Sequence, residues 1–417
     1  MADVKPLYAV HYNLNAIPSL ADVTAPPYDV IDADQRAALL ARSSFNVVEV
    51  DLPEAPGDRD PYEHADETLE AWTLEGILAA DREPAIWALT QDYTGPDGAT
   101  RTRRGFLARV RVTDYGAGLV RPHERTHPGP KEDRLRLTRA TRHNLSPIFA
   151  LHPGAVWDRI EPQLGGAPWG EVTDPDGTVH RVWRVGDPEL HESVSAALAD
   201  AELLIADGHH RYETARAYAE EVGGDGPHRY TLMGLVSLED PGLTVFATHR
   251  LLGRLDPDAS RRLASALEQD FAAEEVPEAE LDPAASEGIG VFGYLGAGSE
   301  RPLRLRLADT TALDDALADR SEAYRRLDAV ILEELVLKRA LGMSDEEIAA
   351  KRGLGYASDA RTALRLLGEG AFEHAFLLRP TPIEQVRAVA AAGETMPPKS
   401  TYFFPKLLTG LVLNPLS

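Results

Sequence analysis

Residues 123–127 spell His-Glu-Arg-Thr-His, which matches the HExxH pattern of zinc proteases. In that pattern both histidines bind one zinc ion from neighbouring turns of a helix, and the glutamate polarises the metal-bound water. Here Pro128 follows the second histidine directly, and a residue before proline is disfavoured in the helical conformation. Pro130 also lacks an N–H group for the helix. We therefore expect residues 123–127 to form a loop, a helix to begin near Lys131, and no zinc to bind.

Residues 201–224, AELLIADGHHRYETARAYAEEVGG, have a pattern that can bind an anion. Residues 203–206 form a short apolar run typical of a buried strand, Asp207 and Gly208 form a turn, and a helix follows. The first N–H groups of a helix have no partner within it, and the helix dipole favours negative charge there. Glycine lets a ligand approach the backbone closely. The same turn carries three side-chain donors: His209, His210 and Arg211.

Other interpretations of this segment stay open. Asp207 could simply cap the helix, because aspartate is a good N-cap. His209 and His210 could bind zinc, but adjacent helical residues point about 100° apart, which suits a single metal poorly. A magnesium ion held by Asp207 and substrate phosphates is the better metal hypothesis. Cations in the first turn oppose the helix dipole by roughly 0.3–1 kcal/mol each, and an anion would reverse that penalty, so we favour a ligand.

Lysine is scarce, and its positions are informative. The sequence has six lysines, and three of them lie near prolines in two short stretches. Lys131 lies in GPKEDR, and Lys399 and Lys406 lie in MPPKSTYFFPK. Lysine and arginine are not interchangeable where a compact point charge is needed. These stretches are therefore candidates for a phosphate or carboxylate site.

The composition excludes several classes of protein. The chain has 417 residues, 43% of them hydrophobic, a length that suits two or three globular domains. It has no cysteine, which excludes disulfides, thiol catalysis and iron–sulfur clusters. The net charge of −24 repels the nucleic-acid backbone, so we expect no nucleic-acid partner. No apolar run is long enough to cross a membrane and no signal peptide is visible, so we expect a cytoplasmic protein without a membrane partner.

Turn signals predict an α+β fold with mixed, mainly antiparallel sheets. Apolar runs flank GPDG within residues 86–112, DPDG within 171–185 and GAGSER within 289–307, and each arrangement is typical of a β-hairpin. The C-terminal part is more helical. Apolar spacing over residues 327–341 predicts a helix that ends at Gly342.

Further elements are expected near the C-terminus. Ser344 begins a capping box for the next helix, and HAFLL predicts a short strand. Thr381 is expected to cap a helix that runs through Ala392, with Pro382 at its first position. The residues from Met396 onwards are rich in proline and aromatic side chains, and we expect them to pack back on the body of the protein.

Several motifs together resemble known proteins. ADGHHRYETA (206–215) resembles the phosphate-binding turn of the ParB/sulfiredoxin superfamily, and nearly the whole chain is similar to domain-of-unknown-function family 1015. The other marks of that family here are APPYDVI (25–31), HERT…GPKEDRLRL (123–137), NLSPIF (144–149), THRLL (248–252) and MPPKSTYFFPKLLTGLVLNPL (396–416). The resemblance implies a ParB/sulfiredoxin-like phosphate-binding core over 101–255. An N-terminal α/β segment over 1–100 and a C-terminal α/β segment over 256–417, whose tail packs on the core, would flank it.

The nearest activity in that superfamily belongs to the free serine kinases, which transfer phosphate from a nucleotide to free serine. The resemblance implies three sets of residues: catalytic Glu124, His123 and Asp207; phosphate- or nucleotide-binding Gly208, His209, His210, Arg211, Lys131 and Arg134; and substrate-binding Tyr28, Asp29, Lys399, Ser400 and Lys406. In this scheme Glu124 is the base for the substrate hydroxyl. Ordinary salt bridges explain the four outlying cations (Lys131, Arg134, Lys399 and Lys406) equally well. Sulfiredoxin activity is excluded, because His209 stands where that chemistry needs cysteine.

The favoured interpretation is a phosphotransferase that acts on a small hydroxy amino acid. It would be a nucleotide-dependent serine kinase or a phosphoserine phosphatase, with ATP or ADP and Mg²⁺ as cofactors. A nucleotide-binding switch without catalysis is the second interpretation, and a metal-dependent hydrolase is the third.

Overall fold

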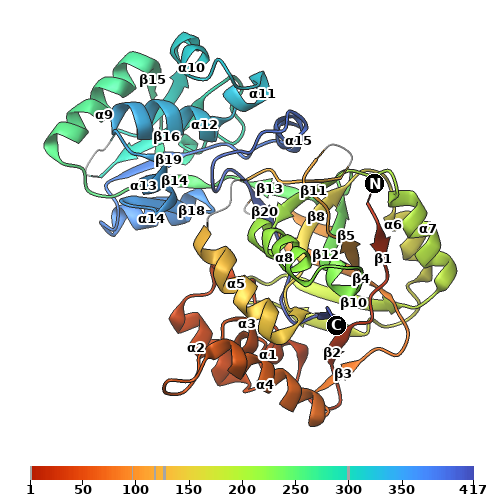
Figure 1. Ribbon diagram of the computed structural model, residues 1–417. Helices are drawn as coiled ribbons and strands as arrows, with labels where there is room; N and C mark the ends of the chain where they lie inside the picture. Colours follow the sequence, from red (N-terminus) through yellow and green to blue (C-terminus); the bar gives the residue numbers. More distant parts are fainter. Residues whose placement is uncertain (1, 96, 117–118, 125–127, 298–300) are drawn as a thin grey trace. The chain divides into compact units, whose positions relative to one another are not determined.

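The computed structural model describes residues 2–95, 97–116, 119–124, 128–297 and 301–417, without the side chains of residues 128–130. Contacts within the chain divide it into two compact units (Figure 1). The first unit comprises Met1–Pro122, Thr126–Leu243 and Pro405–Ser417, and the second comprises His123–Arg125 and Thr244–Phe404. The three domains expected from the sequence stay a prediction.

The first unit contains both strands and helices. Its strands are β1 (Val4–Lys5), β2 (Val10–Tyr12), β3 (Leu78–Ala80), β4 (Ile86–Thr94), β5 (Thr100–Arg111), β6 (Val120–Arg121), β7 (His143–Asn144), β8 (Ile148–His152), β9 (Gly170–Thr173), β10 (Val179–Val185), β11 (Leu203–Asp207), β12 (Tyr230–Ser237) and β21 (Asn414–Pro415). Its α-helices are α1 (Leu20–Val23), α2 (Ala33–Arg42), α3 (Val48–Asp51), α4 (Pro61–Leu74), α5 (Pro128–Thr141), α6 (Trp157–Ile160), α7 (Pro188–Leu198) and α8 (His209–Val222). Short 3₁₀ turns are η1 (Tyr28–Val30), η2 (Glu161–Gln163) and η3 (Pro227–Arg229).

The large sheet of the first unit has the strand order β6-β11-β8-β12-β5-β4-β10-β9, with β1 beside β5. Neighbouring strands are antiparallel except β6–β11 and β8–β12, which are parallel. The hairpins expected within 86–112 and 171–185 are confirmed as β4–β5 and β9–β10. Because side chains alternate along a strand, one face of this sheet packs against α6, α7 and α8. On the opposite face Leu407 lies over Gly234 of β12, where a Cβ atom would come within 2.4 Å of its Cδ1.

Helix α5 begins at Pro128, earlier than the expected start near Lys131. Proline suits the first turn of a helix, because an N–H group there would have no partner within the helix. The prolines therefore mark the beginning of this helix rather than forbid it. His127, the second histidine of the HExxH pattern, lies outside the described residues.

The second unit is also mixed. Its strands are β13 (Thr244–Phe246), β14 (His249–Leu252), β15 (Phe271–Glu275), β16 (Val291–Gly296), β17 (Leu303–Leu307), β18 (Leu354–Ala357), β19 (His374–Leu377) and β20 (Tyr402–Phe404). Its helices are α9 (Pro257–Asp270), η4 (Glu278–Glu280), α10 (Thr311–Ala316), α11 (Glu322–Arg325), α12 (Asp328–Leu332), η5 (Glu333–Ala340), α13 (Asp345–Ala349), α14 (Ala360–Gly368) and α15 (Ile383–Ala391).

The sheet of the second unit has the order β15-β17-β16-β19-β14-β18, and its neighbours are antiparallel. The hairpin within 289–307 is confirmed as β16–β17, and HAFLL provides β19. The capping box at Ser344 is also confirmed. The helix expected over 327–341 is α12 continued by η5, which is π-helical, and Gly342 follows with φ of 73°.

The expected start of the helix through Ala392 is wrong in one detail. Pro382 is the N-cap of α15 rather than its first helical residue, and no side chain caps the helix. The hydroxyl of Thr381 instead donates to the carbonyl of Ser400 at 2.8 Å. A long-range hydrogen bond has therefore replaced the local cap that the sequence suggested.

The C-terminal segment is ordered and largely buried, as expected. Within the second unit β20 pairs with β13, and within the first unit β21 pairs with β7. Leu413 forms a bridge with Val10, and Thr409 forms one with Ala25. Mostly buried apolar side chains from 403 to 416 complete the packing.

The mixed α+β fold with mainly antiparallel sheets is confirmed, whereas a ParB/sulfiredoxin-like core stays a prediction. Within the described part of the chain, the helices are too short or too polar to cross a membrane.

The docking of the C-terminal segment can be tested by truncating a buried side chain. Leu413→Ala should lower the free energy of unfolding by about 2–5 kcal/mol, the usual effect of a buried Leu→Ala change, because Leu413 is only 2% exposed. Leu74→Ala is the control, because Leu74 at the end of α4 is 88% exposed and should change stability little. Urea unfolding measures both, and equal effects would contradict the packing described here.

Candidate functional site

The turn expected at residues 207–208 is confirmed. Strand β11 ends at Asp207, Gly208 adopts φ of 93° and ψ of 30° in the left-handed region, and α8 begins at His209. A side chain at position 208 would also be blocked, because a Cβ atom there would lie 2.9 Å from Nε of Arg211. Gly208 is the N-cap and no side chain caps the helix, so the hypothesis that Asp207 is the cap is wrong.

The carboxylate of Asp207 is instead shared by two cations. Lys406 Nζ donates to Oδ1 at 2.6 Å, and Arg211 Nη2 donates to Oδ2 at 2.6 Å. Burial alone would raise the pKa of Asp207, but the positive charges of Lys406 and Arg211 outweigh burial and hold that pKa well below its usual range. The expectation that Lys406 lies at the turn is therefore confirmed.

Strand pairing explains what else surrounds Arg211. Because β11 and β8 are antiparallel, the end of β11 lies beside the residues that precede β8. Arg211 Nη1 donates to the hydroxyl of Ser146 at 2.9 Å and also to the carbonyl of Pro147. The hydroxyl of Thr409 donates to Ser146 at 3.0 Å. The guanidinium of Arg211 is thus fixed from three sides.

A buried polar network holds the backbone next to Lys406. Gln91 on β4 and Arg103 on β5 face each other across the hairpin, and Arg103 Nε donates to Gln91 Oε1 at 2.9 Å. Gln91 Nε2 donates to the carbonyl of Lys406 at 3.0 Å, and Arg103 Nη2 donates to that of Pro405 at 2.5 Å. Arg103 is 1% exposed, and burial lowers its pKa to about 9. These two residues, together with Ser146 and Thr409, were not expected from the sequence.

One signal in the sequence could have drawn attention to Arg103. Side chains alternate along β5, so Arg103 shares a face with Leu107, and Leu107 is fully buried. An arginine at such a position must find partners inside the protein. Nothing in the sequence, however, indicates that its partners are carbonyls near the C-terminus.

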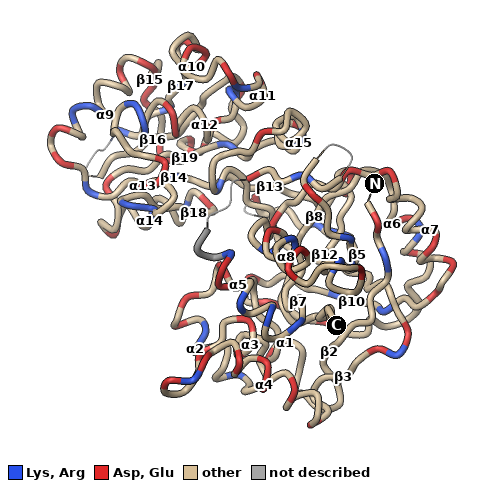
Figure 2. Tube along the Cα trace, in the orientation of Figure 1, with Lys and Arg blue, Asp and Glu red and all other residues tan. Residues whose placement is uncertain are grey.

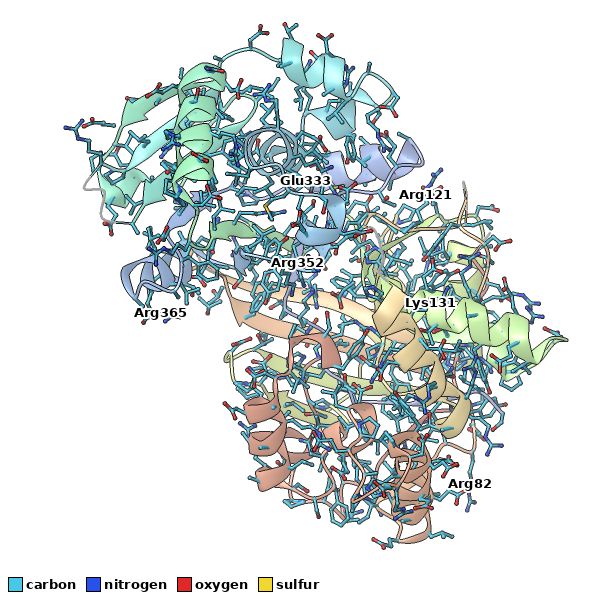
Figure 3. The ribbon with its side chains drawn as sticks, turned by 60° about the vertical axis from the view of Figure 1, so that its left-hand side comes forward. Arg82, Arg121, Lys131, Glu333, Arg352 and Arg365 are labelled. Atoms are coloured by element: carbon cyan, nitrogen blue, oxygen red, sulfur yellow. The ribbon has the colours of Figure 1, made fainter. Side chains whose placement is uncertain are left out.

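The remaining candidates of the first unit are engaged in ion pairs and ring contacts. Arg134 is buried and donates to the Asp51 carbonyl at 2.5 Å and to Asp51 Oδ1 at 3.2 Å, while its guanidinium lies 4.3 Å from the Tyr28 ring centre. Lys131, at the start of α5 (Figure 3), pairs with Glu213 at 3.6 Å. For these two cations the salt-bridge interpretation describes the structure.

A small cavity lies next to these residues. It measures about 40 Å³ and is lined by Tyr28, Asp51, Arg134, Ser146 and Arg211, among others. That volume suits one or two water molecules and is far below the several hundred Å³ of a nucleotide-sized pocket. Burial raises the pKa of Tyr28 to about 12, which keeps its hydroxyl neutral, and the neighbouring Asp29 is exposed. The cavity is therefore a polar wall behind Arg211 rather than a substrate pocket.

Both histidines of the turn lie at the start of α8. His209 is buried, and its charged form would favour the ionised Asp207 beside it. His210 is half-buried. Their proposed phosphate contacts stay a prediction.

The second unit brings together another group of predicted residues. The backbone N–H of Met396 donates to the carbonyl of His123 at 2.7 Å, and Glu124 forms a bridge with Met396. The His123 ring is fully buried and hydrogen-bonds Thr401 Oγ1 at 2.8 Å. His123 therefore ties residues 396–401 to the segment that carries Glu124, which is a structural task. Lys399 and Ser400 lie on this tied segment.

The predicted residues thus form two groups. The first unit contains the following: Tyr28, Asp29, Lys131, Arg134, Asp207, Gly208, His209, His210, Arg211 and Lys406. The second unit contains His123, Glu124, Lys399 and Ser400. The catalytic roles of Glu124, His123 and Asp207 stay predictions.

The residues around Asp207 do not fit a magnesium ion. Both carboxylate oxygens are engaged by cations, and an ion would have to displace Lys406 or Arg211. Across the described residues, no group of three or more histidine, aspartate or glutamate side chains is arranged to hold a metal. Phosphate contacts at this turn would come from N–H groups and cationic side chains.

The shared carboxylate predicts a pH-dependent stability. Asp207→Asn should lower the free energy of unfolding at neutral pH by on the order of 1–3 kcal/mol, because two partly buried cations lose their counter-charge. The folded-state pKa of Asp207 is depressed, so wild type holds this advantage above the unfolded value of about 3.9 and loses it as pH falls further.

Urea unfolding at neutral pH and near pH ~3 measures this difference. Asp114→Asn is the matched control, because Asp114 also pairs with an α8 arginine but is 83% exposed, so it should matter little at either pH. An Asp207→Asn effect that stays constant on acidification would contradict the pairing.

Comparison with known proteins gives weak structural likenesses. A free serine kinase in complex with AMP is 16% identical at a TM-score of 0.36, with 70% of this chain and 88% of that chain covered. A conserved hypothetical protein from Pyrococcus furiosus is 17% identical at a TM-score of 0.36, with 70% and 92% covered. SbnI with C-terminal truncation, from Staphylococcus aureus, is 12% identical at 0.38, with 73% and 85% covered. At these TM-scores the likenesses support no statement about fold or activity.

Sequence comparison is more decisive about the family. No curated protein matches the chain. A family model described as a protein of unknown function, DUF1015, matches residues 4–330, which is most of the chain. The chain therefore belongs to the DUF1015 family.

Proposed function

We propose that the first unit binds the phosphate groups of a nucleotide at the turn between β11 and α8. The observation that carries this proposal is the arrangement at Asp207, where Lys406 and Arg211 flank one carboxylate at the N-terminus of a helix. Two positive charges and one negative charge leave a local excess of positive charge. The partial positive charge of the helix end adds to that excess.

This local excess stands out against the rest of the protein. The chain carries a net charge of −24, and acidic residues are spread over both units (Figure 2). A site for an anion in such a protein needs cations that are held in place, because the overall field repels the ligand. Arg211 is fixed by Ser146, Pro147 and Asp207, so its fork is already oriented before a ligand arrives. Little conformational freedom would then be lost on binding.

The finer proposal is phosphoryl transfer to a small hydroxy amino acid such as serine. The substrate hydroxyl oxygen would form a bond to the terminal phosphorus of the nucleotide while the bridging P–O bond breaks. The shorter nucleotide would leave with the electron pair, and the hydroxyl proton would pass to a base. Arg211 and the helix N–H groups would stabilise the charge on the phosphate oxygens. Phosphoserine hydrolysis would use the same phosphate contacts with water as the nucleophile.

A binding switch without catalysis is the second candidate. The carboxylate at the turn has a strongly depressed pKa and is engaged by two cations, so Asp207 is a poor proton acceptor. Within the first unit the turn is therefore equipped to bind phosphate more clearly than to activate a hydroxyl. The base in the transfer reaction stays a prediction, and Glu124 of the second unit is the candidate.

Nucleotide binding at the turn predicts a loss of affinity without Arg211 or Lys406. Arg211→Gln and Lys406→Gln should each weaken ATP and ADP binding by roughly 10–100-fold, because a hydrogen bond to a charged group contributes about 1.5–3 kcal/mol. Isothermal titration calorimetry gives the dissociation constants. Arg216→Gln is the matched control, since Arg216 lies on the same helix but pairs with Asp114. Affinities within twofold of wild type for both site variants would overturn the proposal.

Transfer activity has a separate test in Glu124. Glu124→Gln keeps the size of the side chain and removes its basicity, so turnover with ATP or ADP and serine should fall by about 10²-fold or more. Nucleotide affinity should change little, which separates this variant from Arg211→Gln. Glu369→Gln, an exposed glutamate paired with Arg365 on α14, is the control within the second unit. Unchanged turnover in Glu124→Gln would exclude it as the base, and absent turnover in wild type with intact nucleotide binding would favour the switch.

A further inference from the structure

The backbone of Lys399 adopts an unusual conformation. Its φ of 60° lies in the left-handed region, which L-residues other than glycine rarely adopt. Such a conformation persists only where the surroundings enforce it, and it is enriched at functional sites. The Lys399 side chain is half-buried, and within the described part of the chain no carboxylate lies at ion-pair distance from its ammonium group.

The loop that carries Lys399 is held by hydrogen bonds to its carbonyl groups. Arg250 Nη1 donates to the Lys399 carbonyl at 2.9 Å, and Arg250 Nη2 donates to that of Pro398 at 3.4 Å. The Ser400 hydroxyl closes the loop on the Pro397 carbonyl at 2.7 Å. Consecutive carbonyl groups from 397 to 400 are thus bound, counting the bond from Thr381. The loop is rigid before any ligand arrives.

Arg250 is suited to this task because it is itself immobile. It is 4% exposed on β14, and its guanidinium lies 5.2 Å from the ring centre of Tyr356 on the neighbouring strand. Glu333, which is buried inside the second unit (Figure 3), and Glu124 both act electrostatically to keep Arg250 charged. A charged group so fully desolvated must be oriented by fixed partners.

A second polar group lies beside the loop without a partner. Arg250 Nη1 donates to the Thr248 carbonyl as well as to that of Lys399, so the two residues are neighbours. The Thr248 side chain is buried, and its hydroxyl oxygen has no hydrogen-bond partner among the described residues. Buried hydroxyls are normally hydrogen-bonded, and an exception calls for an explanation.

We propose that Lys399 and Thr248 form a binding site for a small oxyanion, a phosphate or carboxylate group, on the second unit. Arg250 is the positioning residue that fixes both. The ammonium group would supply the charge and the hydroxyl a hydrogen bond, and the unusual backbone of Lys399 is the conformation that this arrangement requires. All of these residues lie in the second unit, so the proposal does not depend on nucleotide binding at the first.

Reversible lysine labelling with pyridoxal phosphate, an anionic aldehyde, tests the site in the full-length protein. Borohydride reduction traps the product, and mass spectrometry assigns it among the six lysines. Lys399 should be labelled in wild type, and inorganic phosphate or L-serine should protect it. Protection by phosphate only, or by L-serine as well, identifies which oxyanion the site takes. Protection by neither would overturn the proposal.

Two variants separate positioning from general stability. Arg250→Lys should slow labelling at Lys399 by about tenfold, as expected for the loss of one oriented hydrogen bond. Labelling at the exposed Lys5 and Lys351 should stay unchanged, whereas unfolding would accelerate it. Arg379→Lys is the matched control, because Arg379 holds the carbonyls of Ser286 and Gly288, remote from this loop in sequence.

Thr248→Val removes only the hydroxyl and keeps the fold, because that hydroxyl has no protein partner to lose. It should weaken phosphate protection of Lys399 by about tenfold without changing the melting temperature. Full protection in Thr248→Val together with wild-type labelling in Arg250→Lys would overturn the assignment.

Discussion

The carboxylate of Asp207 is shared by Lys406 and Arg211, and the geometry of the candidate site depends on that sharing. One oxygen faces each cation, so the carboxylate fixes a lysine from the C-terminal segment beside the first turn of α8. A buried or half-buried cation needs such a counter-charge, because desolvation is costly. The arrangement still leaves one positive charge in excess. Structural stability and the capacity to attract an anion therefore come from the same three side chains.

Buried arginines are used in a similar way in both units. Arg103 in the first unit holds the carbonyl of Pro405, next to Lys406. Arg250 in the second unit holds the carbonyls of Pro398 and Lys399. Proline lacks an N–H group, so a proline-rich segment cannot join a sheet fully and exposes carbonyls that need other donors. Guanidinium groups supply several donors at once, which explains why arginine inside each unit accompanies lysine on the segment it holds.

Charged residues that looked alike in sequence have different environments in the structure. Arg134 and Lys131 are engaged by Asp51 and Glu213, so they stabilise the packing of α5. Lys406 is engaged at the turn, and Lys399 has no ion-pair partner among the described residues. The scarcity of lysine was therefore an informative signal, although it did not distinguish these outcomes. The distinction depends on which carboxylates lie nearby, and those come from distant parts of the chain.

The sequence by itself determined the elements that depend on neighbouring residues: the three hairpins, the capping box at Ser344, and the strand–glycine–helix turn at Gly208. Turn chemistry and side-chain periodicity act within a few residues, so a local pattern is enough to predict them. Only the tertiary structure decided that Asp207 meets Lys406, which is 199 residues away, rather than capping α8. It also decided that Thr381 bonds Ser400, and that Arg103 and Arg250 bind carbonyls near the C-terminus. Those partners are brought together by strand pairing and by the packing of the C-terminal segment, and no local pattern records which distant groups will meet.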